Sequence, residues 1–195
     1  MLFAAAALAA VGPAEKTLGE HVRIVYLHGA WVLTAELYFG LAALMGLAAL
    51  FGRRPSLHRW SQALGQTGLI FWVTYLPLSL LAMQANWNGL FLAEPRFRLG
   101  LSFAIFGLLL QIGLAFLERP AATSLANVLF FVTLWLAQRR TAYVLHPPPS
   151  PIFSSGNLLL QLYFLTLLFL TALAAWFLTR WLLARGVQGG ESEGF

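Results

Sequence analysis

Five long apolar runs constrain this chain more than any other feature of its sequence. Each is close to the 20 or so residues that an α-helix needs to cross the hydrocarbon core of a bilayer. The runs cover residues 29–51, 60–83, 99–117, 121–138 and 157–179. Helices and closed barrels are the structures that satisfy all backbone hydrogen bonds in lipid. We therefore predict an all-α fold, a polytopic transmembrane helical bundle with five clear spans.

The two ends of the chain differ from these runs. Residues 1–12 are apolar, but twelve helical residues reach only about 18 Å against a hydrocarbon core of ~30 Å. A signal peptide is conceivable there, although the segment lacks a positively charged start. We predict instead a short sixth helix that is retained. Residues 186–195 are rich in Gly and Glu, which predicts a disordered tail after a single transmembrane domain of residues 1–185.

The composition supports a membrane protein and excludes several other classes. Hydrophobic residues make up 59% and charged residues 10% of the chain, whereas soluble domains carry roughly 25% charged residues. The absence of cysteine excludes disulfides, thiolate metal sites and covalent haem attachment to this chain. The charges are scattered over short loops, which argues against a nucleic-acid partner. Hydrolytic and phosphoryl-transfer motifs are missing, so we expect binding rather than turnover chemistry.

The connections between the runs fall into two sets on opposite sides of the membrane. One set comprises residues 13–28, 84–98 and 139–156, and the other comprises 52–59, 118–120 and the tail. Each set carries six of the twelve Lys and Arg residues, but the second set is shorter. The higher density of positive charge predicts that the second set faces the cytoplasm and that the first faces outward.

Two histidines stand at the borders of apolar runs and on the same predicted side. His28 precedes the first run and His146 follows the fourth. Two neutral imidazoles on one face of a membrane protein are what a haem iron or another metal needs as axial ligands. The alternative is that each is an ordinary interfacial residue. His58, on the other side, is predicted to be a loop residue.

Polar and aromatic residues within the runs have simpler interpretations. Glu36 is the one carboxyl group inside an apolar run, so we expect it to face the bundle interior, to be protonated or to meet a partner. Asn127 and Gln62 are expected to make interhelical hydrogen bonds, and Ala42 and Gly46 to permit close helix packing. An interfacial aromatic belt is the ordinary explanation for Trp31, Trp60, Trp72, Trp135, Trp176 and Trp181.

Three segments resemble one known family in order and spacing. Residues 23–28 read Arg-Ile-Val-Tyr-Leu-His and are followed by Trp31, while Trp135 precedes Thr-Ala-Tyr-Val-Leu-His-Pro at 141–147. Both stretches resemble the CcmC-type haem-handling proteins of cytochrome c maturation, which read Arg-Ile-x-Tyr-Ile-His and Trp-x-Thr-Leu-His-Gln-Pro there. Residues 87–98 occupy the position of that family's tryptophan-rich signature and keep its first tryptophan and its arginine as Trp87 and Arg96.

The resemblance implies a non-covalent haem b with His28 and His146 as axial ligands. Trp87, Phe91 and Tyr143 would then line the ring, and Arg96 and Arg98 would pair with the propionates. The implied site lies at the outer face of a bacterial or archaeal cytoplasmic membrane.

The implied task is to present haem for cytochrome c maturation. Its implied partners are the ATP-binding, haem-exporter-type transporter subunits and a periplasmic haem chaperone. Two other functions remain open from the sequence. The first is a membrane-anchor subunit of a respiratory or transporter complex, with or without haem. The second is a scaffold without a cofactor.

Overall fold

The structure, a computed structural model, describes residues 1–14, 18–52, 54–142 and 152–192. All regular elements in these ranges are helices, and no strand occurs in them. The helices are α1 (Leu2–Ala10), α2 (Val22–Gly52), α3 (Pro55–Trp87), α4 (Pro95–Leu117), α5 (Pro120–Arg140) and α6 (Leu158–Ser192). Within the described residues, α2 to α5 and residues Leu158–Arg185 of α6 are long and apolar enough to cross a membrane. The predicted fold class, a polytopic helical bundle, is confirmed.

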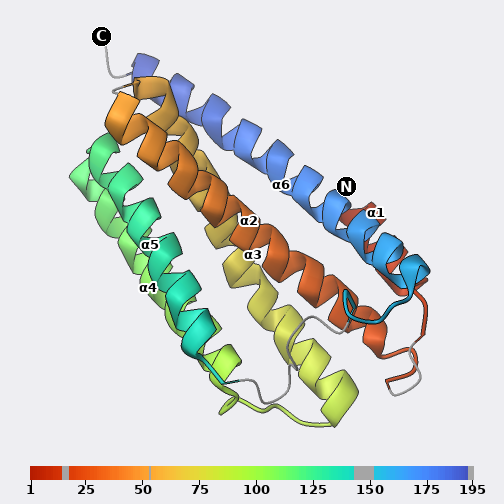
Figure 1. The fold of residues 1–195 in the computed structure, drawn as a ribbon. Helices are drawn as coiled ribbons and strands as arrows, with labels where there is room; N and C mark the ends of the chain where they lie inside the picture. The colour runs from red at the N-terminus through yellow and green to blue at the C-terminus, as the bar shows by residue number, and fades with distance from the viewer. Residues whose placement is uncertain (15–17, 53, 143–151, 193–195) are drawn as a thin grey trace.

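The long helices form a bundle in which α2 and α3 occupy the centre (Figure 1). Helix α2 packs against α3, α5 and α6, while α4 packs against α3 and α5. The start of α2, the end of α3, the start of α4 and the end of α5 lie at one end of the bundle. We call this the His28 end, and we call the other end, formed by Gly52, Pro55, Leu117 and Pro120, the opposite end.

Helices α2, α3 and α4 begin several residues earlier than the apolar runs indicate, so Arg96 and Arg98 lie on α4 and not in a connection. Helix α2 starts at Val22, so His28 lies in its second turn and not in a connection. Helix α3 starts at Pro55, a residue that suits the first turn because its missing N–H is not needed there. The prediction of His58 as a loop residue is therefore wrong. His58 lies on α3, and its Nδ1 is 2.7 Å from Ser124 Oγ on α5.

Small and polar residues bring α2, α3 and α5 close together near the opposite end. The Ser61 hydroxyl donates to the Ala42 carbonyl at 2.8 Å, and the Asn127 amide donates to the Ser61 carbonyl at 2.9 Å. A Cβ atom at Gly46 would lie 2.7 Å from the Ser124 carbonyl oxygen, so only glycine fits there without a shift. The predicted close packing and the interhelical bond of Asn127 are confirmed. The same prediction is wrong for Gln62, which is exposed and has no interhelical hydrogen bond to another described residue.

Helix α6 and the short α1 lie on the other side of α2 (Figure 1). Hydroxyl pairs hold α6 to the bundle, with Thr34 and Thr171 at 2.7 Å and Thr67 and Thr179 at 2.8 Å. The Tyr163 hydroxyl donates to the Leu8 carbonyl and so joins α6 to α1. The predicted short helix near residue 1 is present. The backbone of α6 continues to Ser192, into the segment 186–195 that the sequence predicts to be disordered, and the domain boundary at 185 stays a prediction.

We predict that Asn127→Ala lowers the free energy of unfolding in detergent by about 1 kcal/mol, the usual scale of one interhelical hydrogen bond in a membrane protein. The reason is the loss of the amide that donates to Ser61 on α3. Gln62→Ala is the control, because Gln62 is exposed on α3. Thermal unfolding measures both variants. Equal stability of the two would contradict the role assigned to Asn127.

Candidate functional site

His28 is half-buried on α2 and packs against an aromatic ring on α3. The centroid of its imidazole lies 5.6 Å from that of the Tyr75 ring, and the two planes are tilted by 54°. Tyr75 is itself buried, and its hydroxyl lies so close to α4 that a Cβ atom at Gly100 would overlap it. The indole of Trp72 donates to the Gly100 carbonyl at 3.0 Å. Three helices thus fix the position of the Tyr75 ring beside His28.

A second group of polar side chains lies between α2, α4 and α5. The Gln138 amide, in the last turn of α5, donates to the Glu36 carboxyl at 2.7 Å. Arg96, near the start of α4, is close enough to interact electrostatically with Glu36, and Glu36 and Glu94 are within such range of Tyr75. Glu36 therefore has the partner that the sequence requires.

The connection between α3 and α4 presents apolar side chains at the His28 end. Trp87, the last residue of α3, is half-buried. Phe91 is 44% exposed, and its neighbours Leu90 and Leu92 are exposed as well. Arg98 donates from Nε to the Leu92 carbonyl at 3.3 Å, which braces this connection. The sequence-predicted residues Trp87, Phe91, Arg96 and Arg98 are therefore at the same end of the bundle as His28.

Two predicted site residues, Tyr143 and His146, lie outside the described residues. The described chain flanks them at Ala142, just after α5, and at Ile152, before α6. Ile152 packs against the apolar cluster that contains Val22 and Tyr26 at the start of α2. Both flanks of the undescribed segment are therefore at the His28 end.

The chemistry of the described residues at this end fits a haem. A haem iron takes four nitrogens from the macrocycle and needs only one or two protein ligands, of which His is the commonest. His28 supplies an imidazole beside a buried aromatic ring. Among the described residues, no three His, Cys, Asp or Glu side chains come together as a metal site. The imidazole of His28 would meet the requirement for one axial ligand.

Sequence reasoning missed three residues of this site. Tyr75 and Gly100 belong to no recognisable motif, and their pairing depends on how α3 and α4 cross. Gln138 is 102 positions from Glu36 in sequence. The buried Trp72 departs from the predicted interfacial belt, since it is 2% exposed and lies in the core. Trp72 is an aromatic residue inside an apolar run, about one helical turn before Tyr75. It is the only sequence signal that points to this part of the site.

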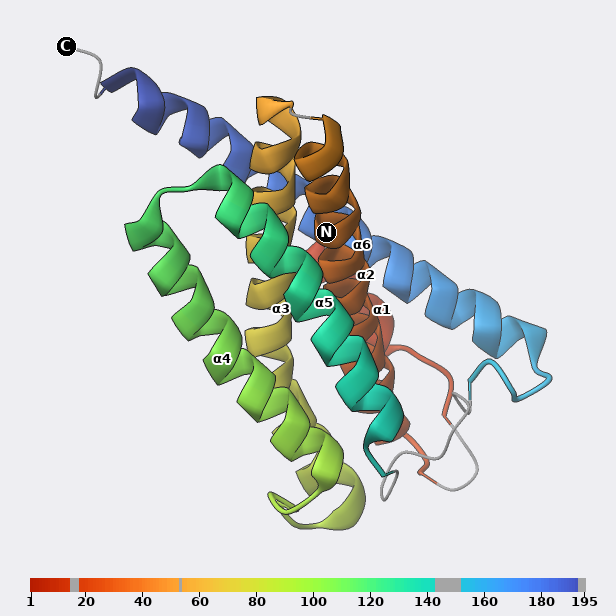
Figure 2. The same ribbon diagram turned by 60° about the vertical axis from the view of Figure 1, so that its left-hand side comes forward.

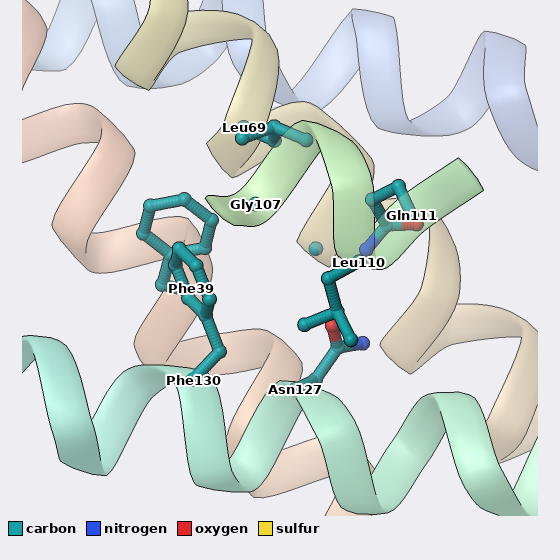
Figure 3. Close-up of a pocket in the computed structure, with 8 residues that line it drawn as sticks. Phe39, Leu69, Gly107, Leu110, Gln111, Asn127 and Phe130 are labelled. Carbon is teal, nitrogen blue, oxygen red and sulfur yellow. The ribbon is translucent and has the colours of Figure 1, made fainter. Parts of the chain in front are cut away.

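A separate crevice lies in the middle of the bundle, between α2, α3, α4 and α5 (Figure 3). It is partly open to the surface and has room for about one water molecule. Figure 3 shows the amides of Gln111 and Asn127 on one side and the rings of Phe39 and Phe130 on the other. None of the predicted site residues that the structure describes lines this crevice.

We predict that Gly100→Ala destabilises the protein and displaces Tyr75, because its new methyl group would overlap the Tyr75 hydroxyl. Overpacking of this kind usually costs about 1–3 kcal/mol. Gly113→Ala on the same helix is the control, since nothing lies within 4 Å of its added Cβ. Thermal unfolding in detergent and tyrosine fluorescence compare the two variants. A Gly100→Ala protein as stable as the control would contradict the contact between α3 and α4.

Comparison of this chain with models of known families, with curated proteins and with solved structures finds no match. The resemblance to the CcmC-type proteins therefore stays a prediction that rests on the residues quoted for it.

Proposed function

We propose that this chain binds haem b at the His28 end, with His28 and His146 as axial ligands. The observation that carries the proposal is the setting of His28. Its imidazole lies on a continuous helix, half-buried, against a tyrosine ring that α3 and α4 hold in place. A ligand on a rigid element keeps its geometry better than one on a loop. The three segments that resemble the CcmC-type family also begin or end at this end of the bundle.

The arginines at this end suit the carboxylate groups of a haem. Guanidinium groups bind carboxylates in a planar, bidentate geometry. Of the two arginines that the sequence selects, Arg96 is the better placed, because it is half-buried, where water and salt screen an ion pair less. Arg98 is exposed, and its Nε already donates to the Leu92 carbonyl. We therefore assign Arg96 as the principal partner of a propionate and Arg98 as a brace for the connection between α3 and α4.

The exposed side chains of Leu90, Phe91 and Leu92 support a surface that another molecule covers. In this proposal Phe91, Trp87 and Tyr143 face the porphyrin. The protein presents haem for cytochrome c maturation at the outer face of a cytoplasmic membrane. ATP-binding, haem-exporter-type transporter subunits and a periplasmic haem chaperone are the proposed partners.

The test is the absorption spectrum, oxidised and reduced, of the full chain purified in detergent from haem-replete cells. We expect a low-spin b-type spectrum that both His28→Ala and His146→Ala weaken or shift, because each removes one axial ligand. His21→Ala and His58→Ala are controls, since His21 is exposed just before α2 and His58 is hydrogen-bonded to Ser124. Both controls should keep the spectrum of the unmodified protein.

Two results would count against the proposal. Absence of haem after reconstitution would exclude haem binding by this chain. A haem that survives both His28→Ala and His146→Ala would exclude these ligands. If haem binds, transfer to an apo-chaperone then separates presentation from electron transport, because a fixed electron-transfer haem should not be released.

A further inference from the structure

Tryptophan and arginine side chains gather at the opposite end of the bundle, away from His28. The indoles of Trp60 on α3 and Trp176 on α6 stack with centroids 5.4 Å apart and planes 19° apart. The Arg180 guanidinium lies 5.9 Å from the Trp176 ring, and the Arg185 guanidinium lies 3.8 Å from the Trp181 ring. We call these five residues the α6 patch.

The arginines of the α6 patch lack an anionic partner within the described part of the protein. Arg180 and Arg185 are exposed, and so are Arg54 and Arg59 at the start of α3. Of the described acidic side chains, only Glu118 belongs to this end. The one ion pair found between described residues is at the His28 end. Among the described side chains at the opposite end, positive charge therefore exceeds negative charge.

The length of α6 places this charge in the surface layer of the membrane. Residues Leu158–Arg185 form an apolar helix of 28 residues, about 42 Å long at 1.5 Å per residue, against a hydrocarbon core of ~30 Å. A helix with such an excess tilts or leaves one end among the headgroups. Figure 2 shows α6 leaning across α3, with its last turns extending away from the other helices. Indole rings are typical of this layer.

We propose that the α6 patch binds the phosphate headgroup of an anionic phospholipid. Guanidinium groups pair well with phosphate, and basic sites between transmembrane helices are known to select anionic headgroups. Beside the arginines, Phe177 is 57% and Trp181 48% exposed. This apolar surface suits the acyl chains of a lipid. Dissolved phosphate has no acyl chains and would leave the surface uncovered. The stacked indoles of Trp60 and Trp176 place this site beside the contact between α3 and α6.

The experiment measures lipid that stays with the full chain after release from vesicles of phosphatidylcholine with a minor fraction of cardiolipin. Native mass spectrometry counts the bound lipids, and no haem is needed for the readout. We expect the unmodified protein to retain cardiolipin over phosphatidylcholine. Arg180→Gln with Arg185→Gln should weaken that retention by about fivefold for each arginine. Arg180→Lys with Arg185→Lys should retain more lipid than the glutamine pair, because lysine still offers a point charge.

The matched control is Arg139→Gln with Arg140→Gln at the His28 end. Arg139 lies 4.1 Å from the Trp135 ring, the same arginine–tryptophan spacing on one helix but without a stacked indole from a second helix. Cardiolipin retention should be unchanged in this control. An equal loss in both glutamine pairs would overturn the proposal, because net charge alone would explain it. Equal retention of the two lipids would also overturn it, and so would displacement of the lipid by millimolar inorganic phosphate. Capture of an acidic protein, with lipid binding unchanged in the α6 variants, would overturn it as well.

Discussion

Close backbone contact between α2, α3 and α5 sets the relative positions of the three central helices of the bundle. In lipid the hydrophobic effect does not draw helices together, so small residues and interhelical hydrogen bonds have to do so. Gly46 lets the Ser124 carbonyl of α5 approach α2, and Ser61 and Asn127 complete the contact with hydrogen bonds. The register set there carries to the far end of the bundle, where Gln138 meets Glu36. Small residues near the opposite end thus determine the geometry of the candidate site at the His28 end.

The fold could be predicted from the sequence because membrane thickness limits what an apolar run can become. Four of the five runs lie within a helix of the structure, and the fifth lies within α6 except for Asn157, which precedes it. The errors concern where helices begin and end. Arg23 and His28 read as loop residues, yet α2 begins at Val22. Arg23 lies in the first turn of α2, where its side chain donates to the Gly12 carbonyl and pairs with Glu20. The same error occurs at His58, whose helix begins three residues earlier, at Pro55.

The candidate site could be predicted only in part. The sequence shows that Glu36 needs a partner, because a lone carboxyl group in an apolar run is costly. It does not show which partner, since Gln138 becomes a neighbour only through the packing of α5 on α2. Tyr75 is hidden for the same reason, and the Leu92 carbonyl that Arg98 contacts is a backbone group that carries no sequence signal. The pairing of His28 with His146 stays a prediction, because His146 lies outside the described residues.

The unequal lengths of the helices have a consequence for access to His28. Helix α5 has 21 residues, about 31 Å, which matches one hydrocarbon core, whereas α2 has 31 residues. The bond between Gln138 and Glu36 sets the last turn of α5 level with Glu36. The part of α2 before Glu36 therefore continues beyond α5 for about 20 Å at 1.5 Å per residue. This part of α2 packs against α1, the start of α6 and the end of α3, and it places His28 about 12 Å along the helix axis from Glu36. Helix α5 therefore ends before it reaches the level of His28, and the side of α2 that α5 covers near Glu36 is left to other segments around this imidazole.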